Sequence, residues 1–123
     1  MKNKPAIVIV DDDENAIELL EYNFSKYGFF TICFSDSLIA IKFLMSNKVD
    51  MIVTDWMMPG KNGLELINSL ENSINKETKK FMVSCISDEK SIKKALNSGV
   101  VRYVAKPIKI ANFIEEVKLC LQA

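Results

Sequence analysis

The chain has 123 residues, with 16 basic and 16 acidic side chains and no histidine. This length fits one globular domain, and the zero net charge excludes a strong attraction of the whole chain to nucleic-acid phosphates or membrane surfaces. The lack of histidine excludes Ser-His and Cys-His catalysis, histidine metal ligands and a phosphohistidine carrier.

Short apolar runs typical of strands alternate with longer runs that have the apolar spacing of helices. In chain order, the pattern predicts a strand over residues 6–10, a helix over 14–27, a strand over 29–34, a helix capped by Ser35 or Asp36, a strand over 49–54, a helix from Leu64, a strand over 81–83, a helix from Asp88 to Gly99, a strand over 100–105 and a helix from Ile110 to the C-terminus. The polar stretch 71–80 is expected to be the loosest part of the chain.

Strands that alternate with helices need right-handed crossover connections. The sequence therefore predicts the α/β class, with a doubly wound, five-stranded parallel sheet and helices on both faces. Residues 6–10 are apolar throughout, which predicts the central strand, buried on both sides. In such sheets, ligands bind at the C-terminal ends of the strands.

Three cysteines, Cys33, Cys85 and Cys120, lie far apart inside apolar runs and form no Cys-x-x-Cys motif. They predict reduced thiols in the core of a cytoplasmic protein. Met45 and Met51 are also expected in the core. The sequence has no signal-peptide core and no apolar run of about 18 residues, so it predicts neither export nor a membrane span.

Polar side chains follow four of the predicted strands. In chain order they are Asp11, Asp12, Asp13, Asp55, Ser84 and Lys106. Carboxylates that lie close together repel one another unless protons or a cation offset their charge. Oxygen ligands without histidine or cysteine suit Mg²⁺, and a carboxylate can accept a phosphoryl group if Mg²⁺, Lys106 and Ser84 offset its charge.

Six segments form an ordered set that is more specific than any one of them. They are Val10–Asp13, Asp55–Gly60, Asn62–Leu66, Ser84–Cys85, Gly99 and Tyr103–Pro107. Together they resemble the receiver domain of two-component response regulators, and the resemblance covers nearly the whole chain. It implies a single receiver domain over residues 1–123, a flavodoxin-like sheet of strand order 2-1-3-4-5, and a cis bond before Pro107.

The resemblance also implies roles for the residues at the strand ends. Asp55 is the expected phosphoacceptor, and Lys106 is expected to bind the phosphoryl group. The expected Mg²⁺ ligands are Asp11, Asp12, Asp55 and the backbone carbonyl of Met57.

A switch is implied by the same resemblance. Ser84 is the hydroxyl expected to turn toward the new phosphate, and Tyr103 is the aromatic side chain expected to rotate with it. Ser87 is the other hydroxyl candidate, and Asp13 is expected to be a surface or capping residue.

The sequence departs from the commonest pattern of the family at Asn62, Met57, Ser84 and Cys85, and none of these departures removes a required group. Met57 and Ile86 occupy positions that tune the access of water in this family, so two apolar residues there are expected to slow hydrolysis of the phosphate. Trp56 is expected beside the site, where its fluorescence could report Mg²⁺ binding.

Function follows as an expectation from the resemblance and from the lack of histidine. The phosphoryl group would come from a phosphohistidine on a histidine kinase or histidine phosphotransferase, and the domain would catalyse only its own phosphorylation and dephosphorylation. The fourth helix, fifth strand and fifth helix would contact a downstream protein or a second receiver. Basic residues cluster around this region at Lys90, Lys93, Lys94, Arg102 and Lys109. No contact of the domain itself with nucleic acid or membrane is expected.

Three alternatives stay open at this point. Asp11 and Asp13 satisfy the Asp-x-Asp motif of a haloacid dehalogenase-like phosphatase, although that scheme has no use for Asp55. A flavin-binding module could use the same fold, although clustered carboxylates repel a flavin phosphate. The chain could also be a fragment of a longer DNA-binding regulator or hybrid sensor kinase; its start at Met1 favours an authentic N-terminus.

Overall fold

Strands and helices alternate along the computed structural model, as the sequence predicted. In chain order the elements are β1 (Ala6–Val10), α1 (Glu14–Lys26), β2 (Phe30–Phe34), α2 (Ser37–Leu44), β3 (Met51–Asp55), α3 (Gly63–Ser69), β4 (Lys79–Ser84), α4 (Glu89–Asn97), β5 (Arg102–Ala105) and α5 (Ile110–Gln122). The structure describes residues 4–122, so the start of the chain at Met1 lies outside the described residues.

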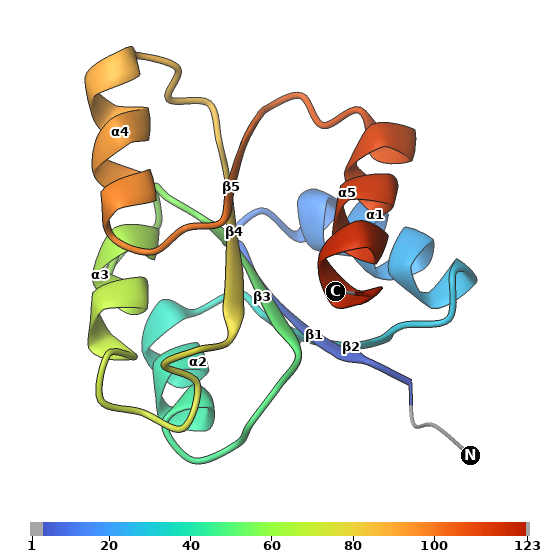
Figure 1. Cartoon of the computed structure of the whole chain (residues 1–123), viewed down its shortest axis with the longest axis horizontal. Helices are drawn as coiled ribbons and strands as arrows, with labels where there is room; N and C mark the ends of the chain where they lie inside the picture. Colours follow the sequence, from blue (N-terminus) through green and yellow to red (C-terminus); the bar gives the residue numbers. More distant parts are fainter. Residues whose placement is uncertain (1–3, 123) are drawn as a thin grey trace.

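All five strands pair in parallel in the order β2-β1-β3-β4-β5, which confirms the predicted fold class and strand order (Figure 1). The middle position belongs to β3, whereas the sequence had placed residues 6–10 there. β1 lies between β2 and β3 and is still covered on both sides. The prediction was wrong because an apolar run reports burial on both faces and does not report the position of the strand in the sheet.

Helices cover both faces of the sheet, with α1 and α5 on one side and α2, α3 and α4 on the other (Figure 1). Side chains alternate between the two faces along each strand. Ile7 and Ile9 therefore pack with α1 and α5, whereas Val8 and Val10 pack with α2 and α3. The C-terminal ends of the strands stay free of helices and form the edge where polar side chains gather.

Acidic or amide side chains cap four helices. Asp13, Asp36, Asn62 and Asp88 each accept backbone N–H groups of the first turn of α1, α2, α3 and α4. Such caps each stabilise a helix by about 1 kcal/mol. The expected capping role of Asp13 is confirmed, and of the two candidates before α2 the cap is Asp36.

The polar stretch 71–80 is not the loosest part of the chain, and this prediction was wrong. Asn75 is fully buried, and its amide donates to the carbonyls of Leu44 (2.6 Å) and Asn47 (2.8 Å). Its carbonyl oxygen accepts the N–H of Val49 (3.0 Å). The side chain therefore ties the connection between α3 and β4 to the connection between α2 and β3.

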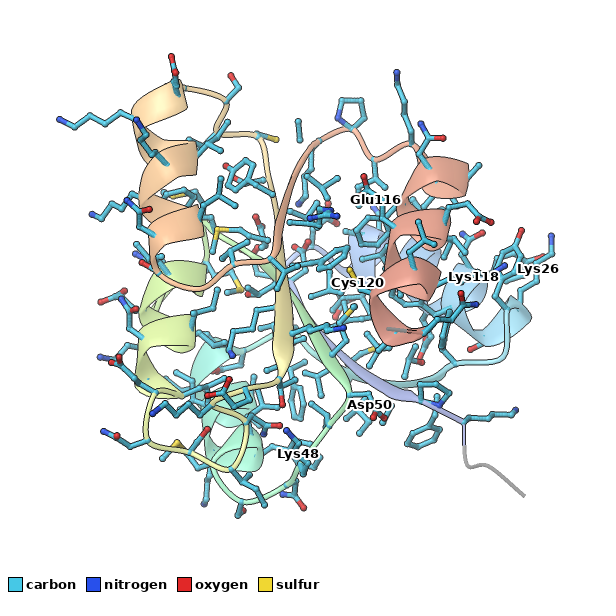
Figure 2. The ribbon with its side chains drawn as sticks, in the orientation of Figure 1. Lys26, Lys48, Asp50, Glu116, Lys118 and Cys120 are labelled. Atoms are coloured by element: carbon cyan, nitrogen blue, oxygen red, sulfur yellow. The ribbon has the colours of Figure 1, made fainter. Side chains whose placement is uncertain are left out.

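Lysines reinforce the same end of the sheet. Lys80 is buried, and its ammonium donates to the backbone carbonyls of Asn75 (3.2 Å), Lys76 (3.1 Å) and Thr78 (2.7 Å). Lys48, which precedes β3 (Figure 2), donates to the hydroxyl of Thr78 (3.0 Å). β4 consequently begins at Lys79, two residues before the predicted start.

Two expectations about sulfur-containing residues were wrong. Cys85 is exposed, and Cys33 and Cys120 are only half-buried, although all three are free thiols as predicted. Met51 is fully buried as expected, whereas Met45 at the end of α2 is exposed.

The Lys106–Pro107 bond is cis, as the family resemblance implied. None of the described helices is long and apolar enough to span a membrane.

Candidate functional site

Asp11 continues the end of β1 and points one carboxylate oxygen at a lysine. Its backbone N–H donates to the Phe34 carbonyl (3.1 Å), and its side chain is almost fully buried. Oδ1 accepts the N–H of Asp13 (2.9 Å), which fixes the rotation of the carboxylate. Oδ2 therefore faces the ammonium of Lys106 at 3.1 Å.

Asp55 ends β3 beside the same lysine. Its Oδ1 accepts the backbone N–H of Trp56 (2.8 Å), and its Oδ2 lies 3.5 Å from Nζ of Lys106. Lys106 follows β5, and its own backbone N–H donates to the Ser84 carbonyl (2.9 Å), which extends the pairing of β4 and β5. One ammonium thus bridges carboxylates from two strands, as the positions of these residues in the sequence had suggested.

The three predicted acidic ligands also lie together. Carboxylate oxygens of Asp11, Asp12 and Asp55 are all within 4.8 Å of one another, and Asp12 is exposed whereas Asp11 is buried.

The cluster has more acidic side chains than basic ones, and this affects the pKa values of Asp55 and Lys106. Burial and the nearby Asp11 carboxylate raise the pKa of Asp55, although Lys106 and the N–H of Trp56 oppose this shift. Burial acts to lower the pKa of Lys106, but its hydrogen bond to Asp11 and the charges of Asp11 and Asp55 outweigh it and raise that pKa. Lys106 is therefore charged at neutral pH, and its one ammonium is shared by Asp11 and Asp55 in a cluster that has three carboxyl groups.

The donor set fits a hard divalent cation. All candidate side-chain ligands are carboxylate oxygens, which is the chemistry that Mg²⁺ and Ca²⁺ prefer, and an added cation would offset the surplus negative charge. The side chain of Met57 is exposed (63%) and contributes no ligand chemistry. The role expected for its backbone carbonyl stays a prediction.

Ser84 and Tyr103 are linked through the backbone of Ile86. Ser84 is buried at the end of β4, and its hydroxyl accepts the N–H of Ile86 (3.1 Å). The Tyr103 hydroxyl donates to the Ile86 carbonyl (2.6 Å), and the Tyr103 ring packs edge-on against Trp56 with 6.1 Å between centroids. Burial raises the pKa of Tyr103, so the phenol stays protonated and able to donate. The other hydroxyl candidate, Ser87, is exposed.

Two residues that sequence analysis left without a role lie against the backbone of Asp55. Thr54 donates its hydroxyl to the Asp55 carbonyl (2.8 Å), and Gly63, the first residue of α3, packs directly on the peptide bond that follows. Gly63 lies in the segment Asn62–Leu66 that carries the family resemblance, but no role was predicted for this glycine. Neither contact leaves a distinctive signal in the sequence. Threonine is common in strands, and Gly63 does not have the positive φ that would mark a position as requiring glycine.

Comparison with known proteins agrees with this geometry. The family model described as "Response regulator receiver domain" matches residues 7–118. The receiver domain of the Francisella response regulator 1452 is 28% identical, with a TM-score of 0.90 and coverage of 97% of this chain and 98% of that one. A two-component response regulator from Clostridium difficile is 25% identical, with a TM-score of 0.90 and 97% of each chain covered. A CheY-like receiver protein from Methanospirillum hungatei is 21% identical, with a TM-score of 0.90 and coverage of 97% and 94%, which shows the fold alone.

Proposed function

Because the chain belongs to the response regulator receiver domain family of two-component systems, we propose that Asp55 accepts a phosphoryl group from a phosphohistidine of a histidine kinase or histidine phosphotransferase. The family is a signalling module. The observation that carries the proposal is the ammonium of Lys106, 3.1 Å from Asp11 and 3.5 Å from Asp55 at the free edge of the sheet. A lysine held between two carboxylates can form a charge-assisted hydrogen bond to a phosphoryl group that becomes attached to one of them.

In the proposed reaction, Asp55 is the nucleophile. Its Oδ forms a bond to phosphorus while the P–N bond to the donor imidazole breaks, and the released imidazole takes up a proton. Lys106 offsets the charge on the transferred phosphoryl oxygens. Hydrolysis of the acyl phosphate by water returns the free carboxylate, so the domain acts only on itself and has no metabolic substrate.

Asp11, Asp12, Asp55 and the Met57 carbonyl would hold Mg²⁺ in this proposal. When bound, Mg²⁺ offsets the carboxylate charges and polarises the phosphoryl group. Receiver domains as a family bind Mg²⁺ at an acidic pocket, and the cluster of three carboxylates within 4.8 Å supports the same role here.

Ser84 and Tyr103 would carry the signal away from Asp55. Ser84 lies one strand away from Asp55, and Ile86 joins its hydroxyl to that of Tyr103 through two hydrogen bonds. A turn of the Ser84 hydroxyl toward phosphate would leave the N–H of Ile86 without its acceptor and loosen the contact that holds Tyr103. The face made by α4, β5 and α5 would then bind a downstream protein or a second receiver.

The match over residues 7–118 supports a single receiver domain over 1–123, and a cytoplasmic location stays part of the proposal. The haloacid dehalogenase-like alternative is not favoured, because it gives no role to Asp55, which lies 3.5 Å from Lys106. The chain could still be a fragment of a longer regulator or hybrid kinase. The chemistry proposed for the site would be the same in that case.

Intact mass spectrometry after incubation with Mg²⁺ and acetyl phosphate tests the proposal. Wild type should gain the mass of one phosphoryl group, and Asp55→Asn should gain none. Asp13→Asn is the matched control, because Asp13 only caps α1 and asparagine is an equally good cap. Uptake by Asp55→Asn equal to wild type, or no uptake by wild type that binds Mg²⁺, would reject Asp55 as the acceptor.

A further inference from the structure

The peptide bond between Asp55 and Trp56 is held at both its carbonyl and its N–H, and the carbonyl of the next peptide is held as well. Its carbonyl oxygen, on Asp55, accepts the Thr54 hydroxyl at 2.8 Å. Its N–H, on Trp56, donates to the Asp55 carboxylate at 2.8 Å. The next carbonyl, on Trp56, accepts the N–H of Gly63 at 2.7 Å. These contacts fix the plane of the peptide, and the Asp55 carboxylate accepts the N–H of that same peptide.

Gly63 lets α3 approach this peptide closely. A Cβ at this position would overlap the carbonyl oxygen of Asp55, and it would lie 2.9 Å from the carbonyl carbon of Asp55 and 3.0 Å from Cα of Trp56. All three are backbone atoms, which cannot move aside as a flexible side chain can. Gly63 does not have a positive φ, so the requirement for glycine comes from contact and not from backbone conformation.

Thr54 contacts the same carbonyl group of Asp55 from within β3. It is fully buried in β3, where valine would have the same shape and an equal preference for a strand. Threonine differs from valine by its hydroxyl, and this hydroxyl donates a hydrogen bond to the carbonyl of Asp55. A buried hydroxyl without a partner is unfavourable, so this hydrogen bond restrains both groups that take part in it.

We propose that Thr54 and Gly63 are positioning residues for phosphoryl transfer, which hold the Asp55–Trp56 peptide and thereby the direction of the Asp55 carboxylate toward Lys106. This inference rests on the proposed role of Asp55 as the acceptor. The hydrogen bond from Gly63 to Trp56 also closes the loop of residues 57–62, so the same contact sets the place of Met57 relative to Asp55.

Three variants test the proposal through the rate constant of phosphoryl uptake from acetyl phosphate at saturating Mg²⁺, corrected for the folded fraction. Gly63→Ala should slow uptake by about 100-fold, because a shift of the acceptor by about 1 Å has an effect of that size. Thr54→Val should slow it by about five-fold, the equivalent of one neutral hydrogen bond. Thr54→Ser keeps the hydroxyl and should restore the rate, which a purely structural role of the threonine methyl group would not do.

Matched controls separate positioning from general loss of stability. Gly99→Ala strains a glycine with φ of +106° that has nothing within 4 Å of the added Cβ, so it should lower stability and leave the rate of uptake unchanged. Thr31→Val makes the same chemical change in β2, away from Asp55. If Gly63→Ala does not fold, the comparison of Thr54→Val with Thr54→Ser decides the question.

The outcomes also distinguish this inference from the proposed function. No uptake by wild type would overturn the proposed function. Uptake by wild type together with equal rates for Thr54→Val and Thr54→Ser, or equal slowing by Gly63→Ala and Gly99→Ala, would overturn only the inference that these two residues position Asp55.

Discussion

Replacing Asp55 with asparagine should stabilise the protein in the absence of metal. The substitution keeps the shape of the side chain and the oxygen that accepts the N–H of Trp56. It removes one of three carboxylates whose oxygens lie within 4.8 Å of one another. It also removes one of the two carboxylates that share Lys106, but Lys106 keeps its shorter contact with Asp11, at 3.1 Å.

The size of the effect follows from the distances. At an effective dielectric constant of about 20, two carboxylates at the 4.8 Å limit of this cluster repel by about 3.5 kcal/mol, and the pair of Asp55 and Lys106 at 3.5 Å attracts by about 5 kcal/mol. Loss of the Asp55 charge relieves two repulsions and one attraction, which favours the variant by about 2 kcal/mol. Solvent screens the exposed Asp12, so we expect a gain in the free energy of unfolding of about 1 kcal/mol.

Urea denaturation with EDTA, and then with Mg²⁺, measures this difference. With Mg²⁺ at one hundred times its Kd, wild type should gain about 2.7 kcal/mol, and the variant, which lacks one ligand, should gain less. The order of stability should therefore reverse when Mg²⁺ is added. A variant that is less stable than wild type in EDTA would refute the view that repulsion among the carboxylates outweighs the attraction to Lys106.

Three further predictions follow from the same structure. The raised pKa of Asp55 means that the folded protein binds this proton more readily than the unfolded chain, so the free energy of unfolding contributed by Asp55 falls as pH rises above the ordinary value of 3.8. The advantage of Asp55→Asn in EDTA should therefore shrink as pH falls from 7 toward 4, and a constant difference would contradict this assignment. Asn75→Ala should lower the free energy of unfolding by about 3 kcal/mol, measured in urea, because its buried backbone partners lose their hydrogen bonds. The change in Trp56 fluorescence on Mg²⁺ binding should survive that substitution, and its loss would show that the two ends of the sheet are coupled. Met57→Asn should shorten the lifetime of the phosphorylated protein followed by intact mass, whereas an unchanged lifetime would reject the idea that an apolar Met57 keeps water from the phosphate.

The core of the site could be predicted because topology places it. Parallel strands joined by helices bring all their C-terminal ends to one edge, so residues that directly follow strands meet there whatever the loops between them do. Asp11, Asp55 and Lys106 were predicted in this way, and the ammonium of Lys106 lies 3.1 Å from the Asp11 carboxylate and 3.5 Å from that of Asp55. Only the identification of strands was needed, and their apolar β-branched runs are a strong signal.

The connection between α3 and β4 could not be predicted for the opposite reason. Its composition is polar, and local patterns treat polar segments as exposed. Asn75 is nonetheless fully buried, because carbonyls of Leu44 and Asn47 and the N–H of Val49, all far away in the sequence, meet around its amide. The match between one side chain and backbone groups of another connection is a tertiary property, and no spacing along the chain encodes it.

The two ends of β4 differ in how their side chains are held, and the proposed switch lies at only one of them. At its start, the Lys80 ammonium donates to three backbone carbonyls of the preceding connection, and Lys79 donates to the Cys120 carbonyl of α5, so this end is anchored to that connection and to α5. At its other end, Ser84 holds only the N–H of Ile86 through its hydroxyl. β4 is paired with β3 and β5 up to its last residues, so under the proposed switch a change at the Ser84 side chain would be expressed in the segment that follows the strand. That segment carries the carbonyl of Ile86, to which the Tyr103 hydroxyl donates, so the proposed switch would pass sideways from β4 to β5.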